Sequence, residues 1–359
     1  MLVVNSYAVE VDEAIQRLRE QNASKILIQS PLGLRSVAYK VGEILRNHGF
    51  EVIFSSSNCW GGCDVAYPEA MQVNVDTIIH IGHSRFLRRD IMPTIYLECR
   101  YADPSPIISI ADKIANELEK FEIVGLAASV QWLDYLSTIT ELLRERGIKS
   151  LTEKPDMYSV YEGQVLGCDV SAMKKIEENV DAYLVLGSVF HGLGLAVSTL
   201  KPVYAADPHI QKVTNLEHQR EKLLRQRFAQ IAAFKKASKI GVLVSIKLGQ
   251  KRMGLAKYLA KLLNSHEKEA FVATADEINP NTISENRFEG FVNTACPRLS
   301  LEDQLQFSKP VLLPVETLVA LGLLDWVEVV EKGFLMYPWG WHSKEIGGKI
   351  WKQVVQLKI

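Results

Sequence analysis

The order of a strand, a tight loop and a long helix recurs three times along this chain of 359 residues. Each of these strands is a nearly continuous apolar run, such as residues 240–244, which is typical of strands that helices cover on both faces. Each following helix carries apolar residues three and four positions apart, for example Leu255, Tyr258 and Leu262. The pattern predicts an α/β fold with mainly parallel sheets.

The three copies divide the chain into similar domains, which we expect at residues 1–105, 106–215 and 216–359. In the first domain, strands are predicted at residues 25–30, 52–56, 77–82 and 93–97. In the second they are predicted at 123–128, 182–187 and 202–205, with another near Ser150. In the third they are predicted at 239–246, 270–274, 290–294 and 310–314. We therefore expect three similar small open-sheet α/β domains around a central site, with a helix over 217–237 joining the second domain to the third.

The composition narrows the class of protein. Hydrophobic residues make up 47% of the chain and charged residues 23%, as in soluble globular proteins. The net charge of −1 argues against a partner that is a nucleic acid or an anionic membrane. No apolar run reaches the roughly 18 residues of a membrane span, and the first residues do not resemble a secretory signal. We expect a cytoplasmic protein, in which the five cysteines bind metal or catalyse rather than form disulfides.

Cysteines occur in one turn of each domain, beyond a predicted strand. The first turn contains Cys59 and Cys63, the second Cys168 and the third Cys296. Ligands of open α/β sheets bind beyond the carboxyl ends of the strands, so the three turns are compatible with one shared site. Soft thiolates favour zinc or an iron–sulfur cluster, and three of them leave a fourth position open for a substrate. The alternative for each cysteine is a small buried apolar side chain.

Other polar residues also follow predicted strands. His83 and His191 occupy matching places in the first two domains, where they either contact a ligand or are half-buried and satisfied. Arg298 follows Cys296 by two residues and could bind a carboxylate with two hydrogen bonds, unless it forms a surface ion pair. Gly33 opens a helix, where free N–H groups suit an anion. The aromatic segment 337–342 is expected to pack into a core or over a groove.

Several segments together resemble the diphthamide-synthesis family, the 2-(3-amino-3-carboxypropyl)histidine synthases. The resemblance covers nearly the whole chain, with Trp60 and Gly62 in place of the usual Tyr and Ala, and a different segment at 339–341. The segments that carry it are Trp60-Gly61-Gly62-Cys63-Asp64, His80-Ile81-Gly82-His83-Ser84, Gly163-Gln164-Val165-Leu166-Gly167-Cys168, Phe190-His191 and Ala295-Cys296-Pro297-Arg298-Leu299-Ser300.

The resemblance implies that Cys63, Cys168 and Cys296 hold a [4Fe–4S] cluster, and it leaves Cys59 and Cys99 without a role. It also implies a transferase that cleaves S-adenosylmethionine by non-standard radical chemistry. The 3-amino-3-carboxypropyl group would pass to a histidine of translation elongation factor two, the first step of diphthamide biosynthesis. The archaeal form is a homodimer, and an electron donor not identified from the sequence would be needed. As contacts for S-adenosylmethionine we hypothesise Gln29, Ser30, Gly33, His83, Ser84, His191 and Arg298.

Two other functions remain open. Quinolinate synthase also has three α/β domains around a cluster held by three cysteines, but its open iron acts as a Lewis acid. Its characteristic segments are not found in this sequence. The alternative that is not an enzyme is a zinc-stabilised protein that binds a ligand.

Overall fold

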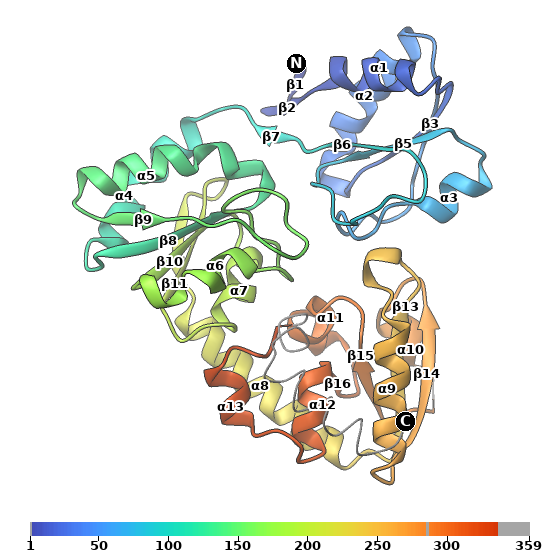
Figure 1. Cartoon of the computed structure of the whole chain (residues 1–359), viewed down its shortest axis with the longest axis vertical. Helices are drawn as coiled ribbons and strands as arrows, with labels where there is room; N and C mark the ends of the chain where they lie inside the picture. The colour runs from blue at the N-terminus through green and yellow to red at the C-terminus, as the bar shows by residue number, and fades with distance from the viewer. Residues whose placement is uncertain (1, 285–286, 337–359) are drawn as a thin grey trace.

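The computed structural model describes residues 2–284 and 287–336, and these form three units with a common sheet topology. Figure 1 shows them as a blue, a green and an orange-to-red lobe, whose inner edges face one another. The aromatic segment 337–342 lies outside the described residues, as does the differing segment 339–341. Among the described helices, none has the length and apolar character needed to cross a membrane.

The first unit contains a parallel sheet in the order β4-β3-β5-β6. A separate antiparallel sheet, β1-β2-β7, pairs the start of the chain with the residues that lead into the second unit. The elements are β1 (Leu2–Val4), β2 (Tyr7–Val9), α1 (Val11–Glu20), β3 (Lys25–Gln29), η1 (Leu32–Leu34), α2 (Arg35–Asn47), β4 (Glu51–Phe54), α3 (Tyr67–Gln72), β5 (Thr77–Ile81), β6 (Thr94–Leu97) and β7 (Arg100–Tyr101).

The second unit has a five-stranded sheet in the order β12-β11-β10-β8-β9, in which only β12 is antiparallel. Its elements are α4 (Ser105–Leu118), β8 (Ile123–Ala128), η2 (Val130–Tyr135), α5 (Leu136–Glu145), β9 (Lys149–Leu151), α6 (Ser171–Lys175), η3 (Glu177–Asn179), β10 (Ala182–Leu186), α7 (Val189–Ala196), β11 (Val203–Asp207) and β12 (Lys212–Asn215).

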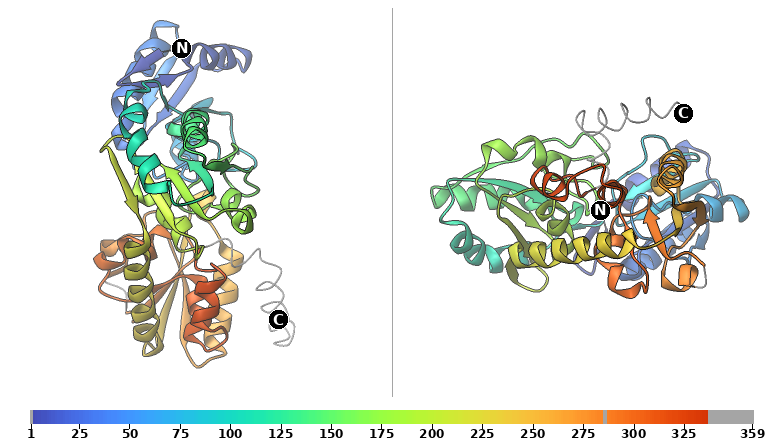
Figure 2. Two further views of the ribbon diagram at one scale, coloured as in Figure 1. Left: turned by 90° about the vertical axis from the view of Figure 1, so that its left-hand side faces the viewer. Right: turned by 90° about the horizontal axis from the view of Figure 1, so that it is seen from below.

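The third unit repeats the parallel order as β14-β13-β15-β16. Its long first helix, α8, runs along the lower edge of the right-hand view of Figure 2. The elements are α8 (Glu217–Lys235), β13 (Lys239–Ser245), η4 (Leu248–Gln250), α9 (Met253–Asn264), β14 (Glu269–Ala275), α10 (Pro280–Ser284), β15 (Gly290–Asn293), α11 (Arg298–Leu301), η5 (Asp303–Gln306), β16 (Val311–Leu312), α12 (Pro314–Ala320) and α13 (Trp326–Glu331).

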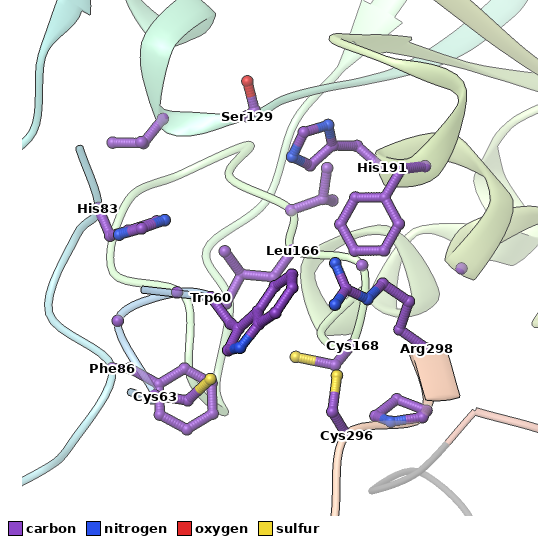
Figure 3. A pocket seen from close by; sticks show the side chains of 18 of the residues that line it. Trp60, Cys63, His83, Phe86, Ser129, Leu166, Cys168, His191, Cys296 and Arg298 are labelled. Carbon is purple, nitrogen blue, oxygen red and sulfur yellow. The ribbon is translucent and has the colours of Figure 1, made fainter. Parts of the chain in front are cut away.

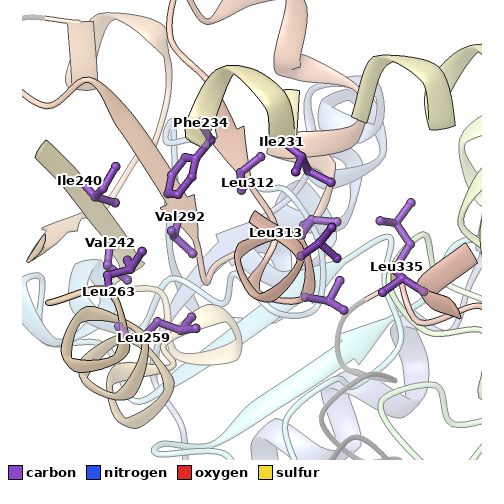
Figure 4. Packing of buried hydrophobic residues seen from close by; sticks show 14 of the residues in the cluster. Ile231, Phe234, Ile240, Val242, Leu259, Leu263, Val292, Leu312, Leu313 and Leu335 are labelled. Carbon is purple, nitrogen blue, oxygen red and sulfur yellow. The ribbon is translucent and has the colours of Figure 1, made fainter. Parts of the chain in front are cut away.

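The apolar strands are buried on both faces, as their sequence pattern predicts. Along β13, Val242 and Val244 pack into one cluster, whereas Leu243 between them packs into another. Successive side chains of a strand point to opposite faces, so only a continuous apolar run can fill both. Figure 4 shows the larger cluster, in which Phe234 of α8 lies beside Val292 of β15. The prediction of an α/β fold with several small open sheets is thereby confirmed.

In all three parallel sheets, the first strand in the sequence lies between the second and the third. A cleft opens at this point of an open sheet, because the chain leaves its two central strands toward opposite sides. The residues expected as domains each contain one such sheet. The short strands β1, β2, β7 and β12 were not predicted, because two to four residues are too few to display a periodicity.

Candidate metal centre

The cysteines of the three units line one cavity of about 210 Å³. Cys63 lies between β4 and α3, Cys168 lies between β9 and α6, and Cys296 follows β15. Figure 3 shows the sulfur atoms of Cys168 and Cys296 close together, with Cys63 across from them. The second strands of two units and the third strand of another therefore lead to the same site.

The third unit holds Cys63 in place. The N–H of Gly249 donates to the carbonyl oxygen of Cys63 over 3.1 Å, and Nε2 of Gln250 donates to its Sγ over 3.4 Å. A Cβ atom on Gly249 would stand 2.5 Å from the Cα of Cys63, well inside van der Waals contact. The loop η4 can approach the cysteine this closely only because residue 249 is a glycine.

Hydrogen bonds from buried polar side chains hold the backbone of the turns that contain Cys168 and Cys296. The carboxylate of Asp169 accepts hydrogen bonds from the backbone N–H groups of Tyr158, Ser159 and Ser171 over 2.7 to 3.0 Å. Asn293 donates to the carbonyl oxygen of Cys296 over 2.8 Å and accepts the N–H of Ala295 over 2.9 Å. Both turns are thus held from inside the protein, leaving the thiols to face the cavity.

The three thiols suit a bound metal centre. Burial and, to a smaller extent, the neighbouring Cys296 raise the pKa of Cys63 to about 12. Burial also raises the pKa values of Cys168 and Cys296. Thiolates bind metal ions well, whereas neutral thiols do not. The three cysteines can therefore become ligands only when a metal cation offsets the charge of their thiolates. Three soft sulfur ligands with a cavity on the fourth side fit an iron–sulfur cluster or zinc.

Arg298 lies at the same end of the cavity as Cys296. Its guanidinium group stacks 4.6 Å above the ring of Trp60, whose Nε1 donates to Glu277 over 3.1 Å. Within the described part of the chain, the buried Nε of Arg298 has no hydrogen-bond partner, and the carboxylate of Asp303 is 3.6 Å away. The guanidinium therefore retains donors for a carboxylate ligand.

The two predicted histidines face this cavity as neutral groups. Burial and, to a smaller extent, the nearby His191 lower the pKa of His83 to about 4. Burial likewise lowers the pKa of His191 to about 4. Ser84 also lines the cavity, where its Oγ accepts a hydrogen bond from Nε2 of Gln164 over 2.6 Å.

The remaining predicted contacts lie elsewhere. Gln29 and Ser30 are buried and are not among the residues that line the cavity. Gly33 lines an adjoining hollow of about 340 Å³ between the first and second units, which we call the outer hollow. The helix start expected to bind an anion therefore does not face the cysteines.

Cys59 and Cys99 are buried outside the cavity, at 8% and 1% exposure. Cys99 donates to the carbonyl oxygen of Leu97 over 3.6 Å. The Sγ of Cys59 lies within 4.8 Å of a ring nitrogen of His80 and of one of His83, so these three groups could hold a metal ion.

An ion pair that sequence reasoning missed fastens the first unit to the third beside the cysteines. Nζ of Lys247 lies 2.8 Å from a carboxylate oxygen of Asp64 and 2.9 Å from one of Glu277. Burial raises the pKa of Asp64 to about 6, although the lysine works against this shift. Lys247 follows the first strand of its unit, and this place could have marked it as a candidate site residue. Nothing in the sequence, however, identifies its partner Asp64, which lies 183 residues away.

Comparisons with known proteins add a second line of evidence. The family model described as "Putative diphthamide synthesis protein" matches residues 30–330. The 2-(3-amino-3-carboxypropyl)histidine synthase of Pyrococcus horikoshii is 34% identical over 90% of this chain and 94% of its own. Subunit 1 of the enzyme of that name from Dictyostelium discoideum is 26% identical over 97% of this chain and 74% of its own.

A solved structure is also similar throughout. The crystal structure of Dph2 from Pyrococcus horikoshii with a 4Fe–4S cluster superposes with a TM-score of 0.82 at 34% sequence identity. The match covers 89% of this chain and 92% of that chain.

Proposed function

This chain belongs to the diphthamide synthesis family, and from that membership we propose that it is a transferase that moves the 3-amino-3-carboxypropyl group of S-adenosylmethionine to a histidine of translation elongation factor two. The observation that carries the proposal is the meeting of Cys63, Cys168 and Cys296 from three units at one cavity. These cysteines would hold a [4Fe–4S] cluster, the group that the similar crystal structure contains.

When bound, a cluster with one open iron would supply the electron that breaks the bond between sulfur and the γ-carbon of S-adenosylmethionine, releasing methylthioadenosine and a 3-amino-3-carboxypropyl radical. Arg298 would bind the carboxylate of the amino acid end through its guanidinium group, which lines the cavity. Ser84, His83 and His191 line the rest of the cavity, where the nucleoside and the acceptor must lie. Apolar neighbours such as Phe86 and Phe190 keep water from the radical.

The proposal also includes the cellular compartment, the oligomeric state and the source of electrons. Three free thiols at the site need a reducing compartment, which favours the cytoplasm. From the family resemblance we propose a homodimer, served by an electron donor that the sequence does not identify.

Product analysis tests the proposed reaction. Anaerobically purified protein should be coloured by its cluster and should bleach on reduction with dithionite. With S-adenosylmethionine and elongation factor two, the reduced protein should form methylthioadenosine and label the factor with the transferred group. A colourless protein with stoichiometric zinc, or no methylthioadenosine under fully reducing conditions, would contradict the proposal.

The ligand assignment is tested by substitution. Cys63→Ala, Cys168→Ala and Cys296→Ala should each lose most cluster iron, because two thiolates cannot replace three. Cys59→Ala and Cys99→Ala should retain it, since neither thiol lines the cavity. The measurement is iron per chain after anaerobic reconstitution. If Cys59→Ala loses its iron while Cys63→Ala keeps it, the assignment is wrong.

A further inference from the structure

A chain of hydrogen bonds leads from the backbone of the first unit to His83 on the cavity wall. It begins at Gln29, the last residue of β3, which is 1% exposed. Its Nε2 donates to the carbonyl oxygen of Asp64 over 2.7 Å, and its Oε1 accepts the N–H of Ala66 over 3.0 Å. A carbonyl can only accept and an N–H can only donate, so the two backbone groups determine which way the amide points.

The orientation of this amide determines the tautomer of His80. Oε1 of Gln29 lies 2.9 Å from Nδ1 of His80. The oxygen carries no hydrogen, so Nδ1 must carry one and donate it. His80 is fully buried in β5, and burial lowers its pKa well below the usual value, which keeps the ring neutral. Its other nitrogen, Nε2, is therefore bare.

The same reasoning extends to His83. Nε2 of His80 lies 3.0 Å from Nδ1 of His83. Since the first atom is bare, Nδ1 of His83 must carry the hydrogen between them. The ring of His83 is also neutral, so its Nε2 is an unprotonated acceptor with no hydrogen-bond partner among the described residues. Free imidazole side chains in water favour the opposite tautomer, and the relay of Gln29 and His80 reverses that preference.

His83 stands where two spaces meet. It lines both the cysteine cavity and the outer hollow, a position that it shares with Gly82, Ser129, Gln131 and His191. Figure 3 shows His83 and His191 on the side of the cavity away from Cys296. A side chain that enters through the outer hollow would therefore reach His83 before it reaches the cysteines. The amino acid end of a cosubstrate, in contrast, has Arg298, which lies across the view from His83 in Figure 3.

We propose that the bare Nε2 of His83 accepts a hydrogen bond from the imidazole N–H of the acceptor histidine, which enters through the outer hollow, and thereby turns its C2 carbon toward the cysteines. The inference rests on the proposed function. The C2 carbon lies between the two ring nitrogens, so holding one N–H orients the carbon that reacts. A neutral acceptor suits a neutral imidazole, whereas an ammonium group would favour a carboxylate. Gln29 and His80 act as positioning residues.

The tautomer can be measured without any turnover. In the full chain labelled with ¹⁵N-histidine, His83 should give a protonated Nδ1 and a bare Nε2 signal at neutral pH, which the variant His83→Asn identifies by their loss. His80→Phe should abolish this preference. Added 4-methylimidazole, an analogue of the acceptor side chain, should shift the Nε2 signal in the wild type. A protonated Nε2, or a shift caused by S-adenosylmethionine but not by 4-methylimidazole, would overturn the proposal.

Product ratios test the same residue during the reaction. Asn at position 83 can still donate to His80 through Nδ2, but its shorter side chain has no acceptor at the position of Nε2. In His83→Asn, transfer to the elongation factor should fall about tenfold relative to methylthioadenosine formation, the upper range for one lost hydrogen bond. The exposed His48→Asn is the control and should transfer normally. If cleavage and transfer fall together, His83 serves the cosubstrate and the inference is wrong.

Two further outcomes show whether the proposed function fails or the chain of hydrogen bonds through Gln29 and His80 fails. If the wild type forms no methylthioadenosine, the proposed function fails, and the response to 4-methylimidazole still decides whether His83 holds an imidazole. A zinc ion at Cys59, His80 and His83 would need the Nε2 lone pair that His80 gives to His83. Zinc that copurifies with the wild type and is lost in Cys59→Ala would therefore overturn the relay.

Discussion

At the scale of single residues, the close contact between the backbones of Gly249 and Cys63 helps to fix the position of this cysteine. Gly249 and Gly33 occupy matching loops after the first strands of their units, yet a Cβ on Gly33 would meet nothing within 4 Å. A Cβ on Gly249 would meet the backbone of Cys63 at 2.5 Å. The two sequence contexts look alike, so only the structure reveals which glycine is essential.

A methyl group at position 249 should therefore push Cys63 away from the site. We expect Gly249→Ala to lower the iron content after reconstitution and to cost about 1–3 kcal/mol of unfolding free energy through overpacking. Gly254→Ala is the matched control, because a Cβ there points into open space near the start of α9 and should be neutral or stabilising. Iron per chain and urea unfolding measure both effects. Full iron retention in Gly249→Ala would refute this account of the loop.

At the scale of elements, one buried arginine joins α8 to the segment after Cys296. Arg227 is 0% exposed and donates to the carboxylate of Glu316 at the start of α12. It also donates to the carbonyl oxygens of Ser300 in α11 and Val311 in β16, over 2.6 and 2.8 Å. Because α11 begins at Arg298, this network also supports the residue that we assign to the carboxylate of S-adenosylmethionine.

Substitution of Arg227 should lower the free energy of unfolding far more than substitution of a neighbouring arginine on the same helix. Arg227→Met leaves Glu316 buried without its cation, which should cost about 3–5 kcal/mol. Arg225→Met breaks only an exposed pair with Glu221 at 3.7 Å and should cost less than about 1 kcal/mol. Chemical unfolding of both variants measures the difference. Equal stabilities would mean that the buried network does not stabilise the third unit.

At the scale of the whole molecule, an ion pair, a hydrogen bond and a pair of stacked rings connect the units near the cavity. Lys247 pairs with Asp64 between the third unit and the first. Gln131 of the second unit donates to the carbonyl oxygen of Gly82 in the first over 2.8 Å. The rings of Phe86 and Tyr158 stack 4.2 Å apart across the same boundary. The buried His80 and the partly buried His83 and His191 lie at this junction of the first two units, which makes it sensitive to pH.

Acid should weaken the fold through these histidines. Burial holds the pKa of His191 at about 4, below the usual 6.5, so the unfolded chain takes up a proton before the folded one does. Stability is therefore retained above pH 6.5 and lost as the pH falls, by about 1.4 kcal/mol per pH unit for each such histidine. The raised pKa of Asp64 works in the opposite direction, so the test is the difference between wild type and His191→Asn in urea unfolding from pH 7.5 to 4.5. A constant difference would contradict the prediction.

The sequence by itself determined the local architecture of this protein. Apolar runs and helical spacing depend on residues near one another, so they predicted the parallel strands and the turns that carry Cys63, Cys168 and Cys296. The family resemblance, which motifs carry, was confirmed by the comparisons.

Only the tertiary structure decided which of these turns meet and what supports them. Gly249 touches Cys63, and Gln29 lies behind the cavity wall, where it is connected to His83 through the buried His80. Such contacts depend on how the three units pack, and local periodicity contains no information about that packing. The physical reason is that a strand or helix follows from its own neighbours in sequence, whereas a site between units follows from surfaces whose residues lie far apart in the sequence.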